Sequence, residues 1–434
     1  MTNLQLFELI SDIDSSYIIA AARPVRRYNM SKWTKIGGVA ACLCLIIAGI
    51  FAVSSSFSDR IPLPIDPEQT TASTDILNGE VTLGDDTVNS LPVLSIDENS
   101  LFGGGMGFEG LMYRDISEVQ NGNPWNEETQ LETLPVYKNL GYSYHGVQNY
   151  LESDEMVARV KETAKLLGIE ITDWDFGIVF SQIGENEFLD ETTYAEGANA
   201  DIKIRAFANG DVFINYEKAR ELPDSINFTR ESTTHEDGLI ALEYLSGEYA
   251  EFMNYTETEC TTINGDYNIY GEQQKRDYII YEGSGDYAED IVNYNLNYTE
   301  FVPEFGGEQG ELDTGNLGDV RRYDHLVCAE KVGDYPLISA DEAEELLFSG
   351  IYLTSVPHDI VETDIVAKVE LVYTKGVTSQ YFMPVYKFYI PLSGRENGHN
   401  FDRSNGLITF GIYYVPAISG EYIADMPTSA GRFN

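Results

Sequence analysis

The sequence has few of the residues on which disulfide-stapled domains and many catalytic sites depend. Only four of its 434 residues are cysteine and five are histidine. Cys42 and Cys44 lie in one apolar run, which leaves Cys260 and Cys328 for the rest of the chain. These two can form one disulfide or remain two buried thiols. Neither arrangement is a disulfide framework, so a hydrophobic core must stabilise the fold.

Basic residues are also scarce. The chain has 27 Lys and Arg against 71 Asp and Glu, a formal net charge of −44. Residues 1–57 hold five basic and three acidic side chains, so the remainder has a net charge of −46. Such a surface repels phosphate groups, and we therefore exclude a nucleic-acid partner.

The common catalytic motifs are missing from the sequence. It contains no G-x-S-x-G, no H-E-x-x-H and no phosphate-binding glycine loop. The histidines lack metal-ligand spacing. Residues 264–272 and 283–290 are rich in oxygen ligands that calcium accepts, but neither segment fits the twelve-residue calcium loop. We predict a protein without catalytic residues, cofactor or metal.

One long apolar run, "GGVAACLCLIIAGIFAV" within residues 36–53, contains no charge. The eighteen residues 36–53 would form a helix of about 27 Å, which spans a hydrocarbon core. We predict a single transmembrane helix at 36–55, which places the chain in the cell membrane. Lipidation at Cys42 would need a longer apolar region before it, and cleavage after Ser54 remains an alternative that would release the chain.

Charge around the span predicts its orientation. Five basic residues precede the run and only Arg60 closely follows it, so the N-terminus should be cytoplasmic and the C-terminal domain extracellular. We expect four parts in chain order. They are a cytoplasmic amphipathic segment (1–35), the membrane span (36–55), an extracellular flexible tether (56–128) and an extracellular domain (129–425), which can divide into units 129–217, 225–327 and 332–420.

The extracellular domain shows helices followed by alternating strands, which predicts an α+β fold of helix-plus-meander units. We expect a helix over 153–168 capped by Ser153, and a hairpin with a two-residue turn at Asn209-Gly210. A second helix should start at Gly238, with strands following it, one of them over 293–301. A third should start with a capping box formed by Ser339 and Glu342.

Tyrosine is abundant, with 29 residues gathered in the expected strands. Ordinary β-propensity and half-buried packing explain such residues. An aromatic face that binds a sugar or a peptide explains them as well.

The cytoplasmic segment carries apolar residues at helical spacing. Thirty-five residues cannot bury these groups alone, so they need a protein partner or the membrane surface. Acidic residues among them disfavour an anionic lipid surface, which favours a protein partner. The candidate partner-binding residues are Leu6, Phe7, Ile10, Ile13, Tyr17 and Ile18.

Several stretches resemble a protein family. "LFELISDIDSSYIIAAARP" followed by "KWTKIGGVAACLCLII" resembles the N-termini of membrane-anchored anti-sigma-factor-like proteins of Firmicutes. "KVGDYPLISADEAEELLFSG" and "GIYYVPAISGEYI" resemble the exterior part of that group, and "ISADEAEELL" is similar to PepSY-like envelope-regulator modules. The resemblance implies a cytoplasmic sigma factor as partner. Residues 1–35 contain no His or Cys, and therefore lack the zinc-binding cluster of many anti-sigma domains.

These observations favour a single-pass membrane sensor and regulator. Its inside helices would bind the cytoplasmic partner, and its acidic exterior domain would sense the envelope. The alternative is a membrane-anchored, non-catalytic extracellular protein that binds an envelope glycan or peptide.

Overall fold

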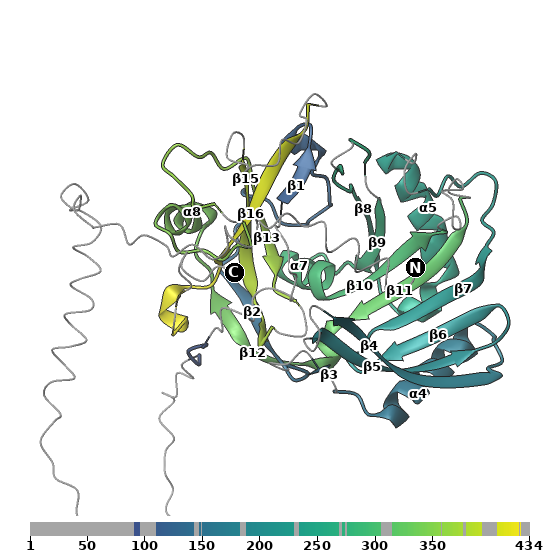
Figure 1. Ribbon diagram of the computed structural model, residues 1–434. Coiled ribbons are helices and arrows are strands. Elements are labelled where there is room, and N and C mark those ends of the chain that lie inside the picture. Colours follow the sequence, from purple (N-terminus) through teal and green to yellow (C-terminus); the bar gives the residue numbers. More distant parts are fainter. Residues whose placement is uncertain are drawn as a thin grey trace, which may run out of the picture. The chain divides into compact units, whose positions relative to one another are not determined.

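The protein has a mixed α+β fold, as the sequence predicts, with mostly antiparallel sheets and few helices. The computed structural model describes residues 91–95 and 110–426 (Figure 1), which belong to one compact unit, 86–434. The segments 1–35 and 36–55 lie outside the described residues. The gaps in the described range are 143–146, 149, 183–187, 230–233, 269–270, 274–275, 305–314, 357, 376–378, 393–405 and 425.

A nine-stranded sheet forms one half of the unit. Its strand order is β3-β5-β6-β7-β11-β10-β9-β8, and β4 pairs with β5. All pairs are antiparallel except the short pair of β3 with β5. The strands are β3 (Val147–Gln148), β4 (Asp173–Gln182), β5 (Phe188–Ala198), β6 (Ile202–Phe207), β7 (Val212–Arg220), β8 (Thr258–Ile263), β9 (Asp277–Glu282), β10 (Asn297–Pro303) and β11 (Leu317–Asp324).

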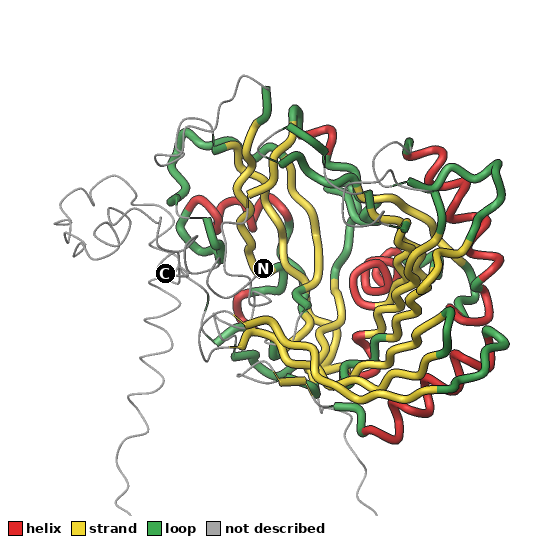
Figure 2. Tube along the Cα trace, turned by 45° about the vertical axis from the view of Figure 1, so that its right-hand side comes forward, coloured by secondary structure: helices red, strands yellow, loops and turns green. Residues whose placement is uncertain are grey.

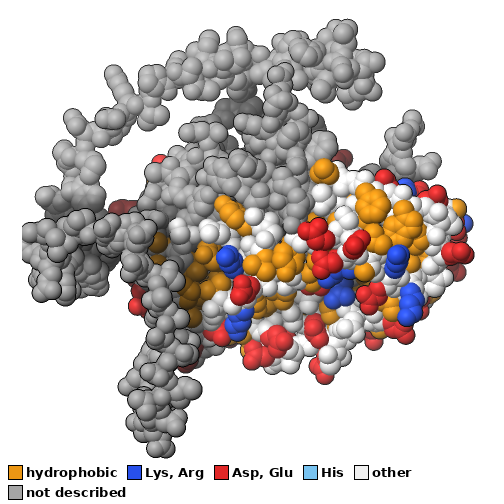
Figure 3. Space-filling model, turned by 90° about the horizontal axis from the view of Figure 1, so that it is seen from below, with side chains coloured by type: hydrophobic (Ala, Val, Ile, Leu, Met, Phe, Trp, Pro, Cys, Tyr) orange, Lys and Arg blue, Asp and Glu red, His pale blue; other side chains and the backbone are white. Residues whose placement is uncertain are grey.

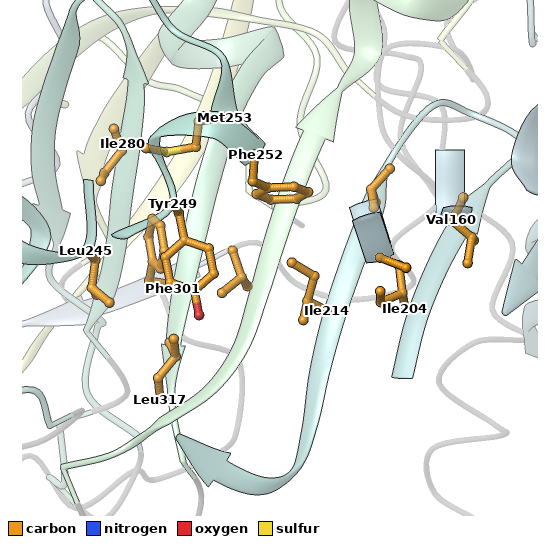
Figure 4. Close-up of a cluster of buried hydrophobic side chains, with 14 of the residues drawn as sticks. Val160, Ile204, Ile214, Leu245, Tyr249, Phe252, Met253, Ile280, Phe301 and Leu317 are labelled. Carbon is orange, nitrogen blue, oxygen red and sulfur yellow. The ribbon is translucent and has the colours of Figure 1, made fainter. Parts of the chain in front are cut away.

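Three helices cover one face of this sheet. They are α4 (Ser153–Leu166), α5 (His235–Glu248) and α6 (Ala250–Met253). Alternate strand residues point towards them because successive side chains of a strand face opposite sides. Ile204, Ile214 and Phe301 are fully buried there against Leu245 and Tyr249 (Figure 4). This is the largest hydrophobic core of the described residues.

The other half holds two smaller sheets and a second core. The four-stranded sheet has the order β1-β16-β15-β13 and the three-stranded sheet the order β12-β2-β14. Helix α8 (Ala340–Phe348) packs on β16. The strands are β1 (Gly110–Tyr113), β2 (Thr133–Asn139), β12 (Ala329–Pro336), β13 (Lys368–Tyr373), β14 (Tyr381–Phe382), β15 (Pro384–Pro391) and β16 (Ile408–Pro416), with short 3-10 turns at Ile116–Glu118, His325–Cys328 and Gly420–Tyr422.

Helix α7 (Tyr287–Leu296) lies between the two halves and contacts β9, β10 and β13 (Figures 1 and 2). The strand expected over 293–301 is therefore wrong in its first four residues. Asp286 caps the helix, since its Oδ1 accepts from the Ala288 amide at 2.9 Å. The six residues 291–296 are all buried, which a helix covered on both sides requires.

The other predicted helices form with small shifts at their starts. Helix α4 begins at Ser153 itself, and Glu152 is its N-cap, because Glu155 Oε2 accepts from the Glu152 amide at 2.9 Å. The second predicted helix, α5, begins three residues before Gly238. The capping box of Ser339 and Glu342 is confirmed at the start of α8.

The hairpin between β6 and β7 has a longer loop than predicted. The Gly210 amide donates to the Phe207 carbonyl at 3.0 Å, and the Phe207 amide donates to the Asp211 carbonyl at 2.9 Å. Gly210 has a φ of +99°, whereas Asn209 is not left-handed. A two-residue type I′ turn needs positive φ at both central residues, so the chain forms a three-residue loop with a glycine bulge.

The sheets join segments that are far apart in the sequence. Strand β7 pairs with β11, and β2 pairs with β12, so these pairs link residues of different predicted units. Strand β1, within the predicted tether, pairs with β16. In the part of the chain that the structure describes, no helix has the length and apolarity to cross a bilayer.

Candidate functional site

The nine-stranded sheet has a second face, which α4 and α5 do not cover. Helix α7 lies over β9 and β10 on this side, where Tyr294 contacts Tyr281 at a ring-centroid distance of 5.6 Å. Over β5, β6, β7, β11 and the start of β10 the face carries aromatic and charged side chains, most of them half-buried. We call this part the open face.

Aromatic side chains form a continuous row across the open face. The five rings come from five neighbouring strands, and consecutive centroids are 6.0, 4.8, 5.4 and 4.8 Å apart. These distances lie in the range at which aromatic pairs attract. In order from β5 to β10, the aromatic row consists of Tyr194, Phe207, Phe213, Tyr323 and Tyr298.

A line of charged residues runs beside the aromatic row. Arg205 binds Glu196 with an Nη2–Oε2 distance of 2.6 Å, and its guanidinium lies 4.8 Å from the Tyr194 ring centroid. Arg321 binds Asp319 with an Nη2–Oδ2 distance of 2.7 Å and lies 5.8 Å from the Phe213 ring centroid. Both arginines therefore have a carboxylate partner and an aromatic partner. The surface of the domain seen from below also shows basic, acidic and hydrophobic side chains interspersed (Figure 3).

A polar cluster closes the β10 end of the row. Lys375 follows β13, and its Nζ donates to the Tyr298 hydroxyl at 3.1 Å. Lys375 is an exposed residue as a whole, but desolvation of its ammonium by the surrounding protein lowers its pKa to about 8, against the opposing effects of Asp211 and Glu300. The face thus places a partly desolvated cation at one end of its aromatic row.

Asp211 is the buried acid of this cluster, with an exposed fraction of 6%. The loop after Gly210 positions it, and its Oδ1 accepts from the Asp324 amide at 3.2 Å while its Oδ2 accepts from Asn209 Nδ2 at 2.8 Å. Burial raises its pKa to about 7, because the two hydrogen bonds offset only part of the desolvation. Its carboxyl therefore titrates near neutral pH.

His325 and Cys328 lie next to this cluster, in the 3-10 turn after β11. Desolvation lowers the pKa of His325 to about 3 and raises the pKa of the Cys328 thiol to about 12. A nucleophilic cysteine needs a low thiol pKa and a nearby base. Here the thiol pKa is raised, and the lowered pKa of His325 makes the imidazole a weak base. The Cys328 thiol instead donates to the His325 carbonyl at 3.3 Å. Cys328 and Cys260 are both free thiols.

The segments with calcium-like oxygen ligands use those oxygens for local structure. Asp290 Oδ1 accepts from the Ser284 amide at 2.7 Å, and Asp286 caps α7. Asn268 and Glu272 bind each other across a turn. Within the described residues, no three His, Cys, Asp or Glu side chains come together as a metal site would require.

The partner-binding residues predicted from the sequence, Leu6 through Ile18, lie outside the described residues, so their role stays a prediction. Tyrosines lie both in the hydrophobic cores and on the open face. Tyr249, Tyr278 and Tyr335 are fully buried, whereas Tyr298 and Tyr323 are half-buried on the open face.

Sequence reasoning missed the aromatic row as a site. The available clue was that Phe207, Phe213 and Tyr323 occupy strand positions opposite to the core-facing ones. Aromatic residues at such outward positions indicate a candidate binding face. The strand order that brings these three side chains into one row cannot be read from the sequence. Comparisons of the chain with protein-family models, curated proteins and solved structures gave no match.

Proposed function

We propose that the chain is a single-pass membrane regulator of the anti-sigma-factor type, with its α+β domain outside the cell. In this proposal residues 1–35 bind a cytoplasmic sigma factor and the span at 36–55 anchors the chain. The exterior domain binds its ligand on the open face without catalysing a reaction. The resemblance of the N-terminal stretches and the distribution of basic residues around the span support the first two parts.

The aromatic row is the observation that supports ligand binding. A sheet face that is exposed to solvent is usually polar, whereas the open face carries a row of five aromatic rings on five strands. Half-buried aromatic residues next to fixed polar groups are typical of binding sites, because rings give contact area and polar groups give orientation. The five rings all belong to strands of one sheet, so the pairing of the strands sets their spacing.

The charges of the open face favour an uncharged ligand. Arg205, Arg321 and Lys203 are each paired with a carboxylate in a domain that is otherwise strongly acidic. A charged ligand that binds at Arg205 or Arg321 would have to break one of these two partly buried pairs, which leaves a charge without its partner. A neutral glycan chain of the envelope can stack its sugar rings on the row and hydrogen-bond the paired side chains. We therefore propose a neutral glycan as the ligand.

The test uses the full-length chain and an uncharged N-acetylglucosamine oligomer as the probe. A probe at 100 times its Kd should stabilise the folded state by about 2.7 kcal/mol, which is visible as a rise in Tm. Phe213→Ala removes the central ring and should weaken binding about tenfold or more. Tyr287→Ala removes an aromatic side chain of α7 that is 60% exposed and does not belong to the row, and should leave binding unchanged.

Equal binding by both variants, or a wild-type chain that binds an uncharged peptide but not the oligomer, would contradict the glycan proposal. The runner-up function, an anchored envelope-binding protein, shares the open face and differs only inside the cell. In that case residues 1–35 are an anchor without a protein partner.

A further inference from the structure

Strand β4 exposes a row of large apolar side chains at the edge of the nine-stranded sheet. Trp174, Phe176 and Ile178 are 40%, 55% and 53% exposed and lie on the same side of the strand. Within the described residues, β4 pairs only with β5, so its outer edge is unpaired. This side of the sheet is the one that α4 covers further in, and Lys161 of α4 lies 5.7 Å from the Trp174 ring centroid.

Such an edge is unusual for a protein that stays alone. Natural edge strands are normally protected by inward charges, prolines or bulges on the exposed side, because an apolar edge pairs with other strands. Here the exposed acids of β4, Asp173 and Asp175, lie on the opposite side from the apolar row. This pattern is typical of an edge strand that pairs with another strand in the functional protein.

We propose that a second copy of this chain covers the edge. The two β4 strands pair antiparallel about a twofold axis at Phe176, which joins two nine-stranded sheets into one. In this register Phe176 faces its own copy, and Trp174 faces the second copy's Ile178. All three apolar positions of each strand thereby meet apolar side chains, as stable cross-strand pairs require.

The same register also keeps the acidic residues on the other side of the strand from facing each other. Asp175 lies opposite the second copy's Gly177, and Asp173 opposite the second copy's Val179, so no carboxylate directly faces another. Glycine fits position 177 in each copy, because a Cβ there would collide with the ring and hydroxyl of Tyr194 as they are placed. The hydroxyl of Tyr194 thus lies over Gly177, within reach of the Asp175 that the register places opposite.

A basic peptide is a weaker candidate than a second copy. The apolar row needs apolar partners, and the register about Phe176 supplies them without leaving the two acids of β4 facing each other. Repulsion between the two acidic domains acts over a Debye length of about 8 Å at physiological salt, so it is largely screened between the distant surfaces.

Cysteine cross-linking in a full-length chain without its four native cysteines tests the register. Phe176→Cys should form a disulfide-linked dimer under mild oxidation, because residues facing each other across paired strands have Cα distances that a disulfide accepts. Trp174→Cys alone should not cross-link, because the two copies of residue 174 are four residues out of register. A mixture of Trp174→Cys and Ile178→Cys chains should cross-link. Absence of the Phe176→Cys dimer, or equal dimer from Trp174→Cys, would overturn the proposal.

Sedimentation of the full-length chain gives an independent readout. Phe176→Asp should weaken self-association at least tenfold, while the chain keeps its far-UV circular dichroism. The matched control Ile365→Asp adds the same charge at an apolar residue that is 72% exposed elsewhere, and should leave self-association unchanged. A wild-type chain that is monomeric, or that associates equally well in both variants, would overturn the proposal and leave an extended peptide as the occupant of the edge.

Discussion

Replacing Asp211 with asparagine should change how the stability of the protein depends on pH. Burial raises the pKa of this carboxyl from 3.8 to about 7. Below about pH 4, Asp211 is protonated in both the folded and the unfolded chain. Between about pH 4 and 7 the folded chain keeps a proton that the unfolded chain has released. The contribution of Asp211 to stability is therefore lost as the pH rises through this window.

The size of the effect follows from the shift in pKa. A shift of about three units corresponds to about 4 kcal/mol, because each unit is worth about 1.36 kcal/mol. Asp211→Asn cannot ionise, although it loses one acceptor for the Asp324 amide or for Asn209 Nδ2. That loss acts equally at every pH. The free energy of unfolding of the variant, measured relative to wild type, should therefore rise by up to about 4 kcal/mol between pH 4 and pH 8.

Urea unfolding at several pH values, followed by tryptophan fluorescence, measures this difference. Asp224→Asn is the matched control, because Asp224 is exposed and its replacement should shift stability by a constant small amount. A difference between Asp211→Asn and wild type that stays constant from pH 4 to pH 8 would contradict a raised pKa of Asp211 in the folded protein. Asp211 would then be ionised in the folded protein throughout this range.

Three further predictions concern stability. Phe301→Ala should lower the free energy of unfolding by about 3–5 kcal/mol, because Phe301 is fully buried in the main core, and a loss under 1 kcal/mol in urea unfolding would contradict this packing. Gly177→Ala should lower the free energy of unfolding by about 1–3 kcal/mol, because the new Cβ collides with the Tyr194 ring. Adding Tyr194→Ala should recover part of this loss. If the losses of the two single variants simply add in the double variant, the collision is contradicted. Reductant should leave the Tm unchanged because Cys260 and Cys328 are free, and a marked drop in calorimetry would indicate a disulfide.

Local signals in the sequence predict much of the fold. The capping box at Ser339 and the left-handed Gly168 and Gly350 mark helix ends that the structure reproduces. In α4 the Ile169 amide donates to the Ala164 carbonyl at 2.8 Å, which is the bond expected when a helix ends at a left-handed glycine. These features depend on residues close in sequence, so the sequence alone determines them.

Helix α7 shows where local reasoning fails. Its last turns contain Asn293 and Asn295, which are poor helix formers and read as part of a strand. Tertiary contacts overcome this preference, since Asn293 Nδ2 donates to the Glu282 carbonyl at 3.0 Å and Asn295 Oδ1 accepts from the Tyr373 amide at 3.2 Å. Tyr373 lies in a strand 78 residues further along the chain. No window of sequence around α7 contains that partner.

The open face was unpredictable for the same reason. Phe213 lies opposite Arg205 in β6 and opposite Arg321 in β11, so the row depends on β7 pairing with a strand more than 100 residues away. Apolar and polar residues alternate along β6 and β7 in the sequence, and the structure buries Ile204 and Ile214 of this pattern completely. The order of the strands, which aligns the aromatic side chains, cannot be read from the sequence.

The most direct test of the proposed function is capture of a partner from cell lysate by residues 1–35. If Phe7 and Ile10 anchor a groove of the partner, each should contribute about 1–3 kcal/mol, so alanine at both weakens binding at least tenfold. We expect the wild-type segment to recover a sigma factor and Phe7→Ala/Ile10→Ala to recover none. Recovery of no sigma factor by either segment, with the wild-type peptide partitioning onto lipid vesicles instead, would contradict it.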